Sequence, residues 1–270
     1  MSPLALKIIG NFSEEYQKYK TNHMTSAMLA WFREQGIHDP CVFNMKNNDV
    51  VISQKGSGAK EIKGPSIVQY KDKTVYVGHM AQSQRSGFGF RSFQGSSLIY
   101  AGGYMNDVKT GQGRLFSIKS NQFVFKGEYA NDFRNGEGHL EKEDGGIYDG
   151  NYFNDKMHGF GKMKWANGDS YEGNFKMEQK EGRGIMKWEN KDKYEGDFVN
   201  NTMNGRGKYT WKNGEFFEGD FKDGLMCGKG VMDYTSAINI KGSGADVHSI
   251  RQMKFEVLGE AKFANKNHAM

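Results

Sequence analysis

Residues 171–188 read YEGNFKMEQKEGRGIMKW, and residues 194–211 repeat the pattern as YEGDFVNNTMNGRGKYTW. Each stretch begins with an aromatic residue, which is followed two positions later by glycine, and a Gly-x-Gly sequence comes about eleven residues into the unit. Apolar and polar residues alternate on both sides of the middle, as they do in strands with one apolar face. The pattern predicts a β-hairpin with a first strand over 171–175, a connection over about 176–181 and a second strand over 182–188.

The aromatic-x-Gly signature recurs seven times along the chain. Its aromatic residues are spaced by 23 to 25 positions and are Tyr76, Tyr100, Phe125, Tyr148, Tyr171, Tyr194 and Phe217. A fixed period of this length indicates a tandem array of supersecondary units. The sequence therefore predicts seven hairpin repeats over residues 76–234.

Each predicted hairpin has one face of aromatic residues and glycines and one charged face. In the unit that starts at Tyr171, Gly173 and Phe175 share the face of the tyrosine, while Glu172 and Asn174 lie on the other. Glycine weakens a strand by roughly 0.5–1 kcal/mol relative to alanine, so its recurrence needs a reason. Because glycine has no Cβ, it leaves room for a ring to lie against the backbone. We assign this structural role to Gly159, Gly161, Gly182, Gly184, Gly205 and Gly207.

The composition excludes several classes of protein. The chain of 270 residues has 36 Gly, 19 Phe, 13 Tyr and only 3 Pro, whereas disordered chains are poor in aromatic residues and collagen is rich in proline. Cys41 and Cys227 stand far apart without metal-type spacing, which argues against a disulfide framework or a zinc module and favours a reducing compartment. No apolar run approaches the roughly 20 residues that a spanning helix needs.

The distribution of charge argues against a nucleic-acid partner. The net charge is +5, but residues 76–234 carry 22 basic and 22 acidic residues, so the excess lies in the flanking segments. A protein that binds nucleic acid needs a basic face to displace counterions. We therefore expect no nucleic-acid binding by the repeats.

The strings YEGNF…EGRGIMKW and YEGDF…NGRGKYTWKNG resemble MORN (membrane occupation and recognition nexus) repeats. The resemblance extends over residues 76–234 and is strongest in the last four units. It implies a mainly β fold, an elongated single-layer antiparallel β-hairpin solenoid. From the residues outside the repeats we add short flanking helices.

The segments before the repeats are predicted to be a helical segment, residues 1–41, and a degenerate capping hairpin, residues 42–75. Ser13 and Gly36 are suitable ends for a helix over 13–35. The apolar stripe of this helix, which includes Met28, Trp31 and Phe32, packs on the protein's own sheet in one interpretation and binds another protein in the other. The capping hairpin would cover the edge of the first strand.

The tail after the repeats, residues 235–270, is predicted to contain a strand, a helix or both. Residues 237–241 could form a last strand. Residues 246–258 have apolar residues at helical spacing, but the MKFEVL sequence that begins at Met253 also suits a strand, and both interpretations stay open.

No residue pattern in the sequence indicates catalysis or a cofactor. The glycine-rich strings lead into strands, whereas a phosphate-binding loop leads into a helix. His158 lies next to Gly159 at a hairpin corner, where a turn or packing role is expected, and no nucleophile–base or paired-carboxylate motif occurs. We therefore expect no catalytic residues, no bound metal, no cofactor and no enzymatic activity.

The leading hypothesis for function is a scaffold that binds other proteins. A single-layer sheet leaves its aromatic face open to partners, and the candidate anchors on that face are Tyr148, Tyr152, Trp165, Tyr171, Phe175, Trp188, Tyr194, Phe198 and Trp211. In the alternative interpretation, these rings are buried by stacking on one another. Met28, Trp31 and Phe32 of the predicted helix are further candidates.

The resemblance also implies a location and a kind of assembly. Small MORN-only proteins similar to this chain belong to cytoskeletal complexes, especially in the axoneme of cilia and flagella, so we expect a cytoplasmic protein of a multi-subunit assembly, with a homodimer as one possibility. The competing hypothesis is an adaptor that binds anionic lipid at a membrane junction. It ranks second because the repeats are balanced in charge.

Overall fold

The computed structural model describes residues 40–44, 50–54, 62–72, 74–93, 96–117, 119–120, 122–233 and 252–257. The chain forms two compact units, Met1–Glu141 and Lys142–Met270. All regular secondary structure within the described ranges is β-strand. The predicted helix over 13–35, with Met28, Trp31 and Phe32, lies outside these ranges.

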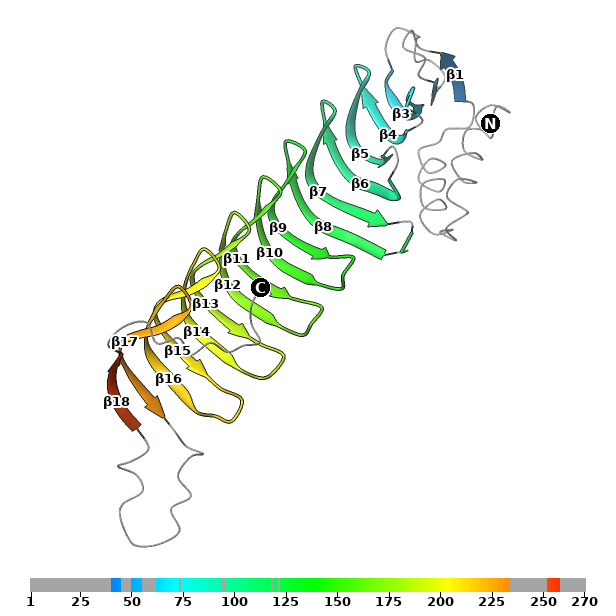
Figure 1. The fold of residues 1–270 in the computed structure, drawn as a ribbon. Helices are drawn as coiled ribbons and strands as arrows, with labels where there is room; N and C mark the ends of the chain where they lie inside the picture. Colours follow the sequence, from blue (N-terminus) through cyan, green and yellow to red (C-terminus); the bar gives the residue numbers. More distant parts are fainter. Residues whose placement is uncertain are drawn as a thin grey trace, which may run out of the picture. The chain divides into compact units, whose positions relative to one another are not determined.

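The first unit contains nine described strands, and each pairs antiparallel with the next along the chain (Figure 1). The strands are β1 (Pro40–Asn44), β2 (Val50–Gln54), β3 (Gly64–Gln69), β4 (Val75–Ala81), β5 (Gln84–Ser92), β6 (Leu98–Met105), β7 (Val108–Ser117), β8 (Gln122–Ala130) and β9 (Phe133–Glu141). Strands β2 and β3 contain the apolar runs of the segment that was predicted to cap the repeats, and Val51 pairs with Val68. The capping role of this segment stays a prediction.

The second unit continues in the same way, and its described strands again pair antiparallel in chain order (Figure 1). They are β10 (Ile147–Phe153), β11 (Lys156–Lys164), β12 (Ser170–Lys176), β13 (Gln179–Lys187), β14 (Lys193–Val199), β15 (Thr202–Thr210), β16 (Phe216–Lys222), β17 (Leu225–Asp233) and β18 (Gln252–Val257). The predicted mainly β fold of tandem antiparallel hairpins is thereby confirmed.

The tail forms a strand where a short helix was one of two interpretations. Strand β18 pairs antiparallel with β17, with Met253 opposite Met232 and Phe255 opposite Gly230. Met253, Phe255 and Val257 alternate with polar residues, and this period of two decides for a strand over the helical spacing.

Each repeat hairpin is closed by a tight turn of two residues. In the unit of Tyr171 the turn is Met177–Glu178, and both residues have positive φ, 50° and 76°. Two positive φ values characterise the type I′ turn, whose twist matches that of paired strands. The connection predicted over about 176–181 is therefore too long, because the second strand begins at Gln179.

A β-bulge in each hairpin accounts for the residues that the predicted connection contained. Between β12 and β13, Gly173 pairs with Gly184 while Phe175 pairs with Lys180, so three residues of β13 lie opposite Asn174. Gly182 lies in this bulge with φ of 66°, a conformation that glycine adopts without steric cost. The first glycine of Gly-x-Gly therefore serves the backbone of the bulge, which corrects the role predicted for Gly159, Gly182 and Gly205.

The second glycine of Gly-x-Gly lies under a ring at Gly161, Gly184 and Gly207. A Cβ on Gly184 would lie 2.5 Å from Cε2 and 2.6 Å from Cζ of Tyr171. The same ring covers Gly173 in its own strand, where an added Cβ would lie 2.5 Å from the tyrosine hydroxyl. Tyr171 is only 1% exposed although it belongs to a hairpin sheet, because the glycines let its ring lie directly on the backbone.

The buried rings form a continuous series of edge-to-face pairs. In the second unit the ring of Tyr171 lies 5.1 Å from that of Phe175 and 5.2 Å from that of Phe198, measured between centroids, with interplanar angles of 83° and 87°. Tyr148 contacts Phe175 and Tyr194 contacts Phe198 in the same way. Such pairs stabilise a core by about 0.5–1.5 kcal/mol each beyond area burial. The rings thus join consecutive hairpins.

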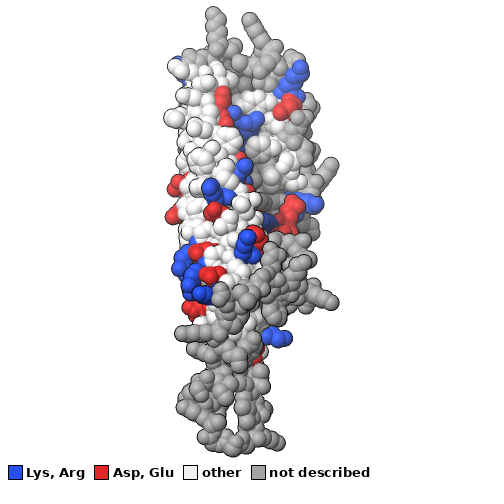
Figure 2. Space-filling model, turned by 60° about the vertical axis from the view of Figure 1, so that its left-hand side comes forward, with Lys and Arg blue, Asp and Glu red and all other residues white. Residues whose placement is uncertain are grey.

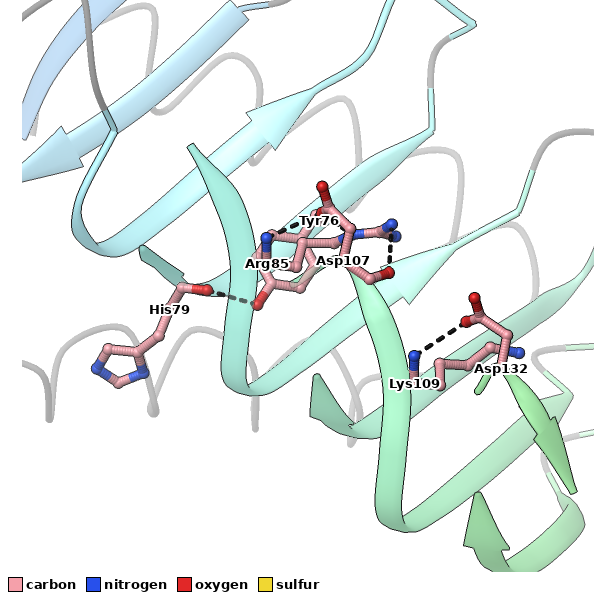
Figure 3. A network of polar contacts seen from close by, with 6 residues as sticks. All are labelled: Tyr76, His79, Arg85, Asp107, Lys109 and Asp132. Carbon is pink, nitrogen blue, oxygen red and sulfur yellow. Dashed lines mark hydrogen bonds and ion pairs between the residues drawn. The ribbon is translucent and has the colours of Figure 1, made fainter. Parts of the chain in front are cut away.

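Neighbouring hairpins are also joined at their tight turns. The backbone N–H of Lys180 donates to the side-chain oxygen of Asn201 at 2.8 Å, and the N–H of Asn201 donates back to the carbonyl of Lys180 at 3.1 Å. The first unit repeats this arrangement, because Asp107 accepts from the backbone of Arg85 and Asp132 from that of Lys109, both at 2.9 Å (Figure 3). We call these contacts the turn ladder.

Candidate functional site

Six of the nine candidate anchors in the repeats are core residues. The exposed fractions of Tyr148, Tyr152, Tyr171, Phe175, Tyr194 and Phe198 lie between 0% and 4%. Their rings pack edge to face against one another, so they present no surface to a partner. The alternative interpretation, in which stacking alone buries the rings, describes these six.

The three tryptophans among the candidate anchors are only half-buried. Trp165, Trp188 and Trp211 each begin the loop that connects one hairpin to the next, and the N–H of Trp165 donates to the carbonyl of Asp169 at 2.9 Å. The ring of Trp211 lies 5.1 Å from that of Tyr209, which also contacts Trp188. These indoles are the repeat anchors that keep an accessible surface.

A buried carboxylate fixes the loop between two of these tryptophans. Asp192 is 3% exposed, and it accepts hydrogen bonds from the hydroxyl of Tyr209 at 2.8 Å, the backbone of Lys212 at 2.9 Å and the side chain of Asn190 at 2.9 Å. A buried carboxylate with three donors is satisfied and rigid. Asp192 therefore holds the loop in place, and its contacts indicate a structural role.

Four cations lie on the aromatic face at one position of the repeat, two residues after the tight turn. They are Arg85, Lys109, Arg134 and, in the second unit, Lys180. Nζ of Lys180 lies 5.5 Å from the ring centroid of Phe198 and 5.6 Å from that of Trp165, which are cation–π distances. Burial lowers the pKa of Lys180, because desolvation penalises its charged form.

Sequence reasoning missed these cations because it placed their positions in the connections between strands. Counting back from Gly182 by twos places Lys180 on the aromatic face, but the predicted connection over about 176–181 treated it as loop. The signal was present in the alignment of the units, since Met157 and Met203 occupy the same position as Lys180 in the neighbouring hairpins.

The first unit contains the most polar cluster of the aromatic face. Nε of Arg85 lies 2.8 Å from Oδ1 of Asp107, and Nη2 donates to the Asp107 carbonyl at 2.8 Å (Figure 3). Cζ of Arg85 lies 5.0 Å from the ring centroid of Tyr104. The hydroxyl of Tyr76 donates to the carbonyl of His79 at 2.9 Å, which fixes its ring beside this cluster (Figure 3).

The opposite face of the hairpins carries paired charges and several exposed apolar side chains. In the second unit Lys162 lies 2.9 Å from Glu172, and basic and acidic side chains are interspersed on the surface that Figure 2 shows. In the first unit Met105, Phe133 and Phe88 are 62%, 47% and 45% exposed. We call this side the outer face. Sequence reasoning did not select these three, although Phe88 replaces a charged residue inside Gly-x-Gly.

Within the described ranges no three His, Cys, Asp or Glu side chains are grouped so that they could hold a metal ion. His158 packs near Phe153, with ring centroids 5.7 Å apart. No helix in that part of the chain is long and apolar enough to cross a membrane.

The family model of the MORN repeat matches residues 100–118, 125–147, 148–170, 171–193, 194–216 and 217–236. The hairpin of β4 and β5 precedes these matches but has the same construction, with Tyr76 fully buried over Gly78 and Gly89 and with Gly87 at φ of 66°. No curated protein sequence matches the chain.

Several solved structures have a loosely similar arrangement of strands. The G-box domain of the microcephaly protein CPAP is 9% identical, with 67% of this chain and 93% of that chain covered and a TM-score of 0.40. The TCP10 domain of Danio rerio CPAP, in complex with a peptide of STIL, is 7% identical over 73% and 89% at a TM-score of 0.38. The TCP domain of Drosophila melanogaster SAS-4, in complex with a proline-rich motif of Ana2, is 8% identical over 67% and 83% at 0.30. A likeness at these TM-scores carries no functional conclusion.

Proposed function

Because this chain is a MORN-repeat protein, we propose that it is a non-enzymatic scaffold that holds other proteins. MORN repeats generally serve as interaction or scaffold modules and not as enzymes. The observation that carries the proposal is that the two faces of the hairpins differ in burial. The aromatic rings of the repeats are buried in the core, whereas large apolar side chains are exposed on the outer face.

The outer face of the first unit offers the best-defined contact surface. Met105 pairs with Val108 across one hairpin and Phe133 pairs with Ala130 across the next, so apolar pairs lie beside two consecutive tight turns. Exposed apolar side chains that are grouped in this way are typical of protein contact sites. We assign partner binding to this surface.

The experiment is affinity capture with the full-length protein from native extract, followed by quantitative mass spectrometry. The double variant Met105→Gln/Phe133→Gln should capture at least about fivefold less of the specific partners, because the substitutions remove two apolar anchors of the interface. The control is Lys126→Gln, an exposed residue of the same unit. Equal capture by the double variant and the wild type would contradict the assignment to this surface.

We further propose that the protein belongs to the cytoskeleton of the ciliary axoneme, within a multi-subunit assembly. Support comes from the resemblance to small cytoskeletal MORN-only proteins, and the location is tested by imaging a tagged chain before and after detergent extraction. Retention on the extracted axoneme is the expected result, and complete release would contradict it. Native mass spectrometry of the purified chain distinguishes a monomer from a homodimer.

A membrane-associated adaptor is the second candidate, and one observation favours it. The aromatic face of the first unit carries Arg85, Arg91, Lys109 and Arg134, and each cation near an anionic lipid surface contributes about 1 kcal/mol. Flotation with vesicles of phosphatidylserine and phosphatidylcholine tests it. Salt-sensitive flotation of the wild type would favour the adaptor, and a protein that stays at the bottom of the gradient would favour the scaffold.

A further inference from the structure

Among the described residues of the first unit, three buried side-chain atoms have no hydrogen-bond partner. They are Nη1 of Arg85, Nε of Arg91 and the hydroxyl of Tyr104. Buried donors in folded proteins are nearly always paired, and an unpaired one is destabilising. Three of them on neighbouring strands point to an acceptor that another molecule supplies.

These three side chains surround the same pair of buried rings. Arg91 pairs with Tyr76 across to β4 and with Tyr100 across to β6. The ring of Tyr104 stands edge-on to both tyrosines, with centroid distances of 5.5 Å and 5.4 Å. Cζ of Arg85 lies 5.0 Å from the Tyr104 centroid, and Cζ of Arg91 lies 5.7 Å from the ring centroid of Tyr70.

Both arginines act electrostatically on Tyr104. Burial raises the pKa of Tyr104, and the positive charges of Arg85 and Arg91 oppose that rise. The hydroxyl is buried, so it stays protonated and can donate a hydrogen bond.

Arg85 is held so that one of its donors stays available. Nε of Arg85 donates to Oδ1 of Asp107 and Nη2 donates to the Asp107 carbonyl, both at 2.8 Å (Figure 3). These two contacts fix the plane of the guanidinium group and leave Nη1 unpaired. A fixed fork loses little side-chain entropy when it binds an oxygen acceptor.

The donors and the charge of the cluster identify the acceptor. Guanidinium groups and a hydroxyl together suit an oxyanion. Asp107 lies against Arg85, and Asp72 is close enough to Arg91 to interact with its charge. Because these carboxylates already place negative charge near the two cations, a monoanionic carboxylate meets less like-charge repulsion here than a phosphate dianion, and a carboxylate is favoured.

We propose that Arg85, Arg91 and Tyr104 form a site for a carboxylate side chain in an acidic segment of a partner protein. The site rests on the proposed scaffold function, and it supplies the chemistry of one contact on the aromatic face. It is separate from the apolar contact of Met105 and Phe133 on the outer face.

The test is fluorescence anisotropy of the full chain with a labelled octaglutamate peptide at low salt. Arg91→Gln should weaken binding at least about tenfold, because a charge-assisted hydrogen bond is lost. Tyr104→Phe should weaken it about threefold to fivefold while the free protein keeps or raises its melting temperature, since the variant removes a buried hydroxyl that has no acceptor. Arg183→Gln, an exposed outer-face change, and Tyr152→Phe, the equivalent tyrosine of the second unit, are the matched controls and should leave binding unchanged.

Several results would overturn the site. Octaglutamine binding as tightly as octaglutamate would remove the role of the carboxylate, and a phosphoserine peptide binding more than tenfold tighter would reassign the site to phosphate. Equal effects of Arg183→Gln and Arg91→Gln would reduce binding to general electrostatics. If Glu14, Glu15 and Glu34, all changed to Gln, tightened peptide binding tenfold, the occupant would be the chain's own N-terminal segment. Equal capture of native partners by the wild type and Arg91→Gln would contradict this site without contradicting the scaffold function.

Discussion

Replacing Gly184 by valine tests the packing principle of the whole repeat. The new Cβ alone would lie 2.5 Å from Cε2 of Tyr171, so the ring has to leave its place on the backbone. Displacement breaks the hydrogen bond from the Tyr171 hydroxyl to the Asn174 carbonyl, which is 2.9 Å long. It also breaks the edge-to-face pairs of Tyr171 with Phe175 and Phe198.

The magnitude follows from these three losses. The hydrogen bond contributes about 1 kcal/mol, each ring pair about 0.5–1.5 kcal/mol, and overpacking of a core costs about 1–3 kcal/mol. Because the contributions overlap, we expect Gly184→Val to lower the free energy of unfolding by about 3–5 kcal/mol. A loss of this size is a large part of the stability of an ordinary domain.

The assay is urea denaturation followed by circular dichroism, with hydrogen exchange of the amides in β12 and β13 as a local measure. Arg183→Val is the matched control, because it places the same side chain one residue away at an exposed position, and it should change stability by less than about 0.5 kcal/mol. In a Tyr171→Leu background the cost of Gly184→Val should fall to about 1 kcal/mol or less. Equal stabilities of Gly184→Val and Arg183→Val would refute the packing of ring on glycine.

Three further predictions follow from the repeat geometry. Gly182→Ala should lower the free energy of unfolding by about 1–2 kcal/mol in urea titrations, because alanine is strained at φ of 66°; an unchanged midpoint would show that the bulge relaxes. Lys180→Met should raise the melting temperature at pH 7, since Met203 occupies the equivalent position in the next hairpin. Because the pKa of Lys180 is lowered in the folded state, the unfolded state binds more protons between that pKa and about 10.5. The free energy of unfolding of the wild type should therefore rise with pH over this range, and Lys180→Met should reduce this pH dependence. Asn201→Ala should cost about 1 kcal/mol and speed exchange of the Lys180 amide, and unchanged exchange would contradict the turn ladder.

The fold class could be predicted from the sequence because one unit repeats with little variation. The alternation of Tyr171, Gly173 and Phe175 with polar residues places each ring on a defined face, and the structure keeps that assignment. The tight turn was misplaced because Met177–Glu178 lacks the usual turn residues. Aligning the units would have placed it, since Asn200–Asn201 fill the same two positions in the next hairpin.

The candidate anchors were harder to judge because burial in this fold does not need a second layer. A ring on an open sheet is expected to meet solvent, but Tyr171 folds back over Gly173 and Gly184 and is enclosed by its neighbours. Periodicity gives the face of a side chain and not the direction of its ring. The cations Arg85 and Lys180 were missed because the predicted connections included their positions, whereas in the structure both residues belong to strands.

The turn ladder gives the array a direction. Each tight turn binds the strand start of the hairpin before it, so Asn201 secures the unit of Tyr171, while its own unit depends on the turn that comes next. Loss of a turn therefore removes a support from the hairpin that precedes it in the chain, while the hairpin that contains the lost turn keeps its contact with the next turn. Damage at one turn is therefore expected to spread toward the amino terminus before it spreads toward the carboxyl terminus.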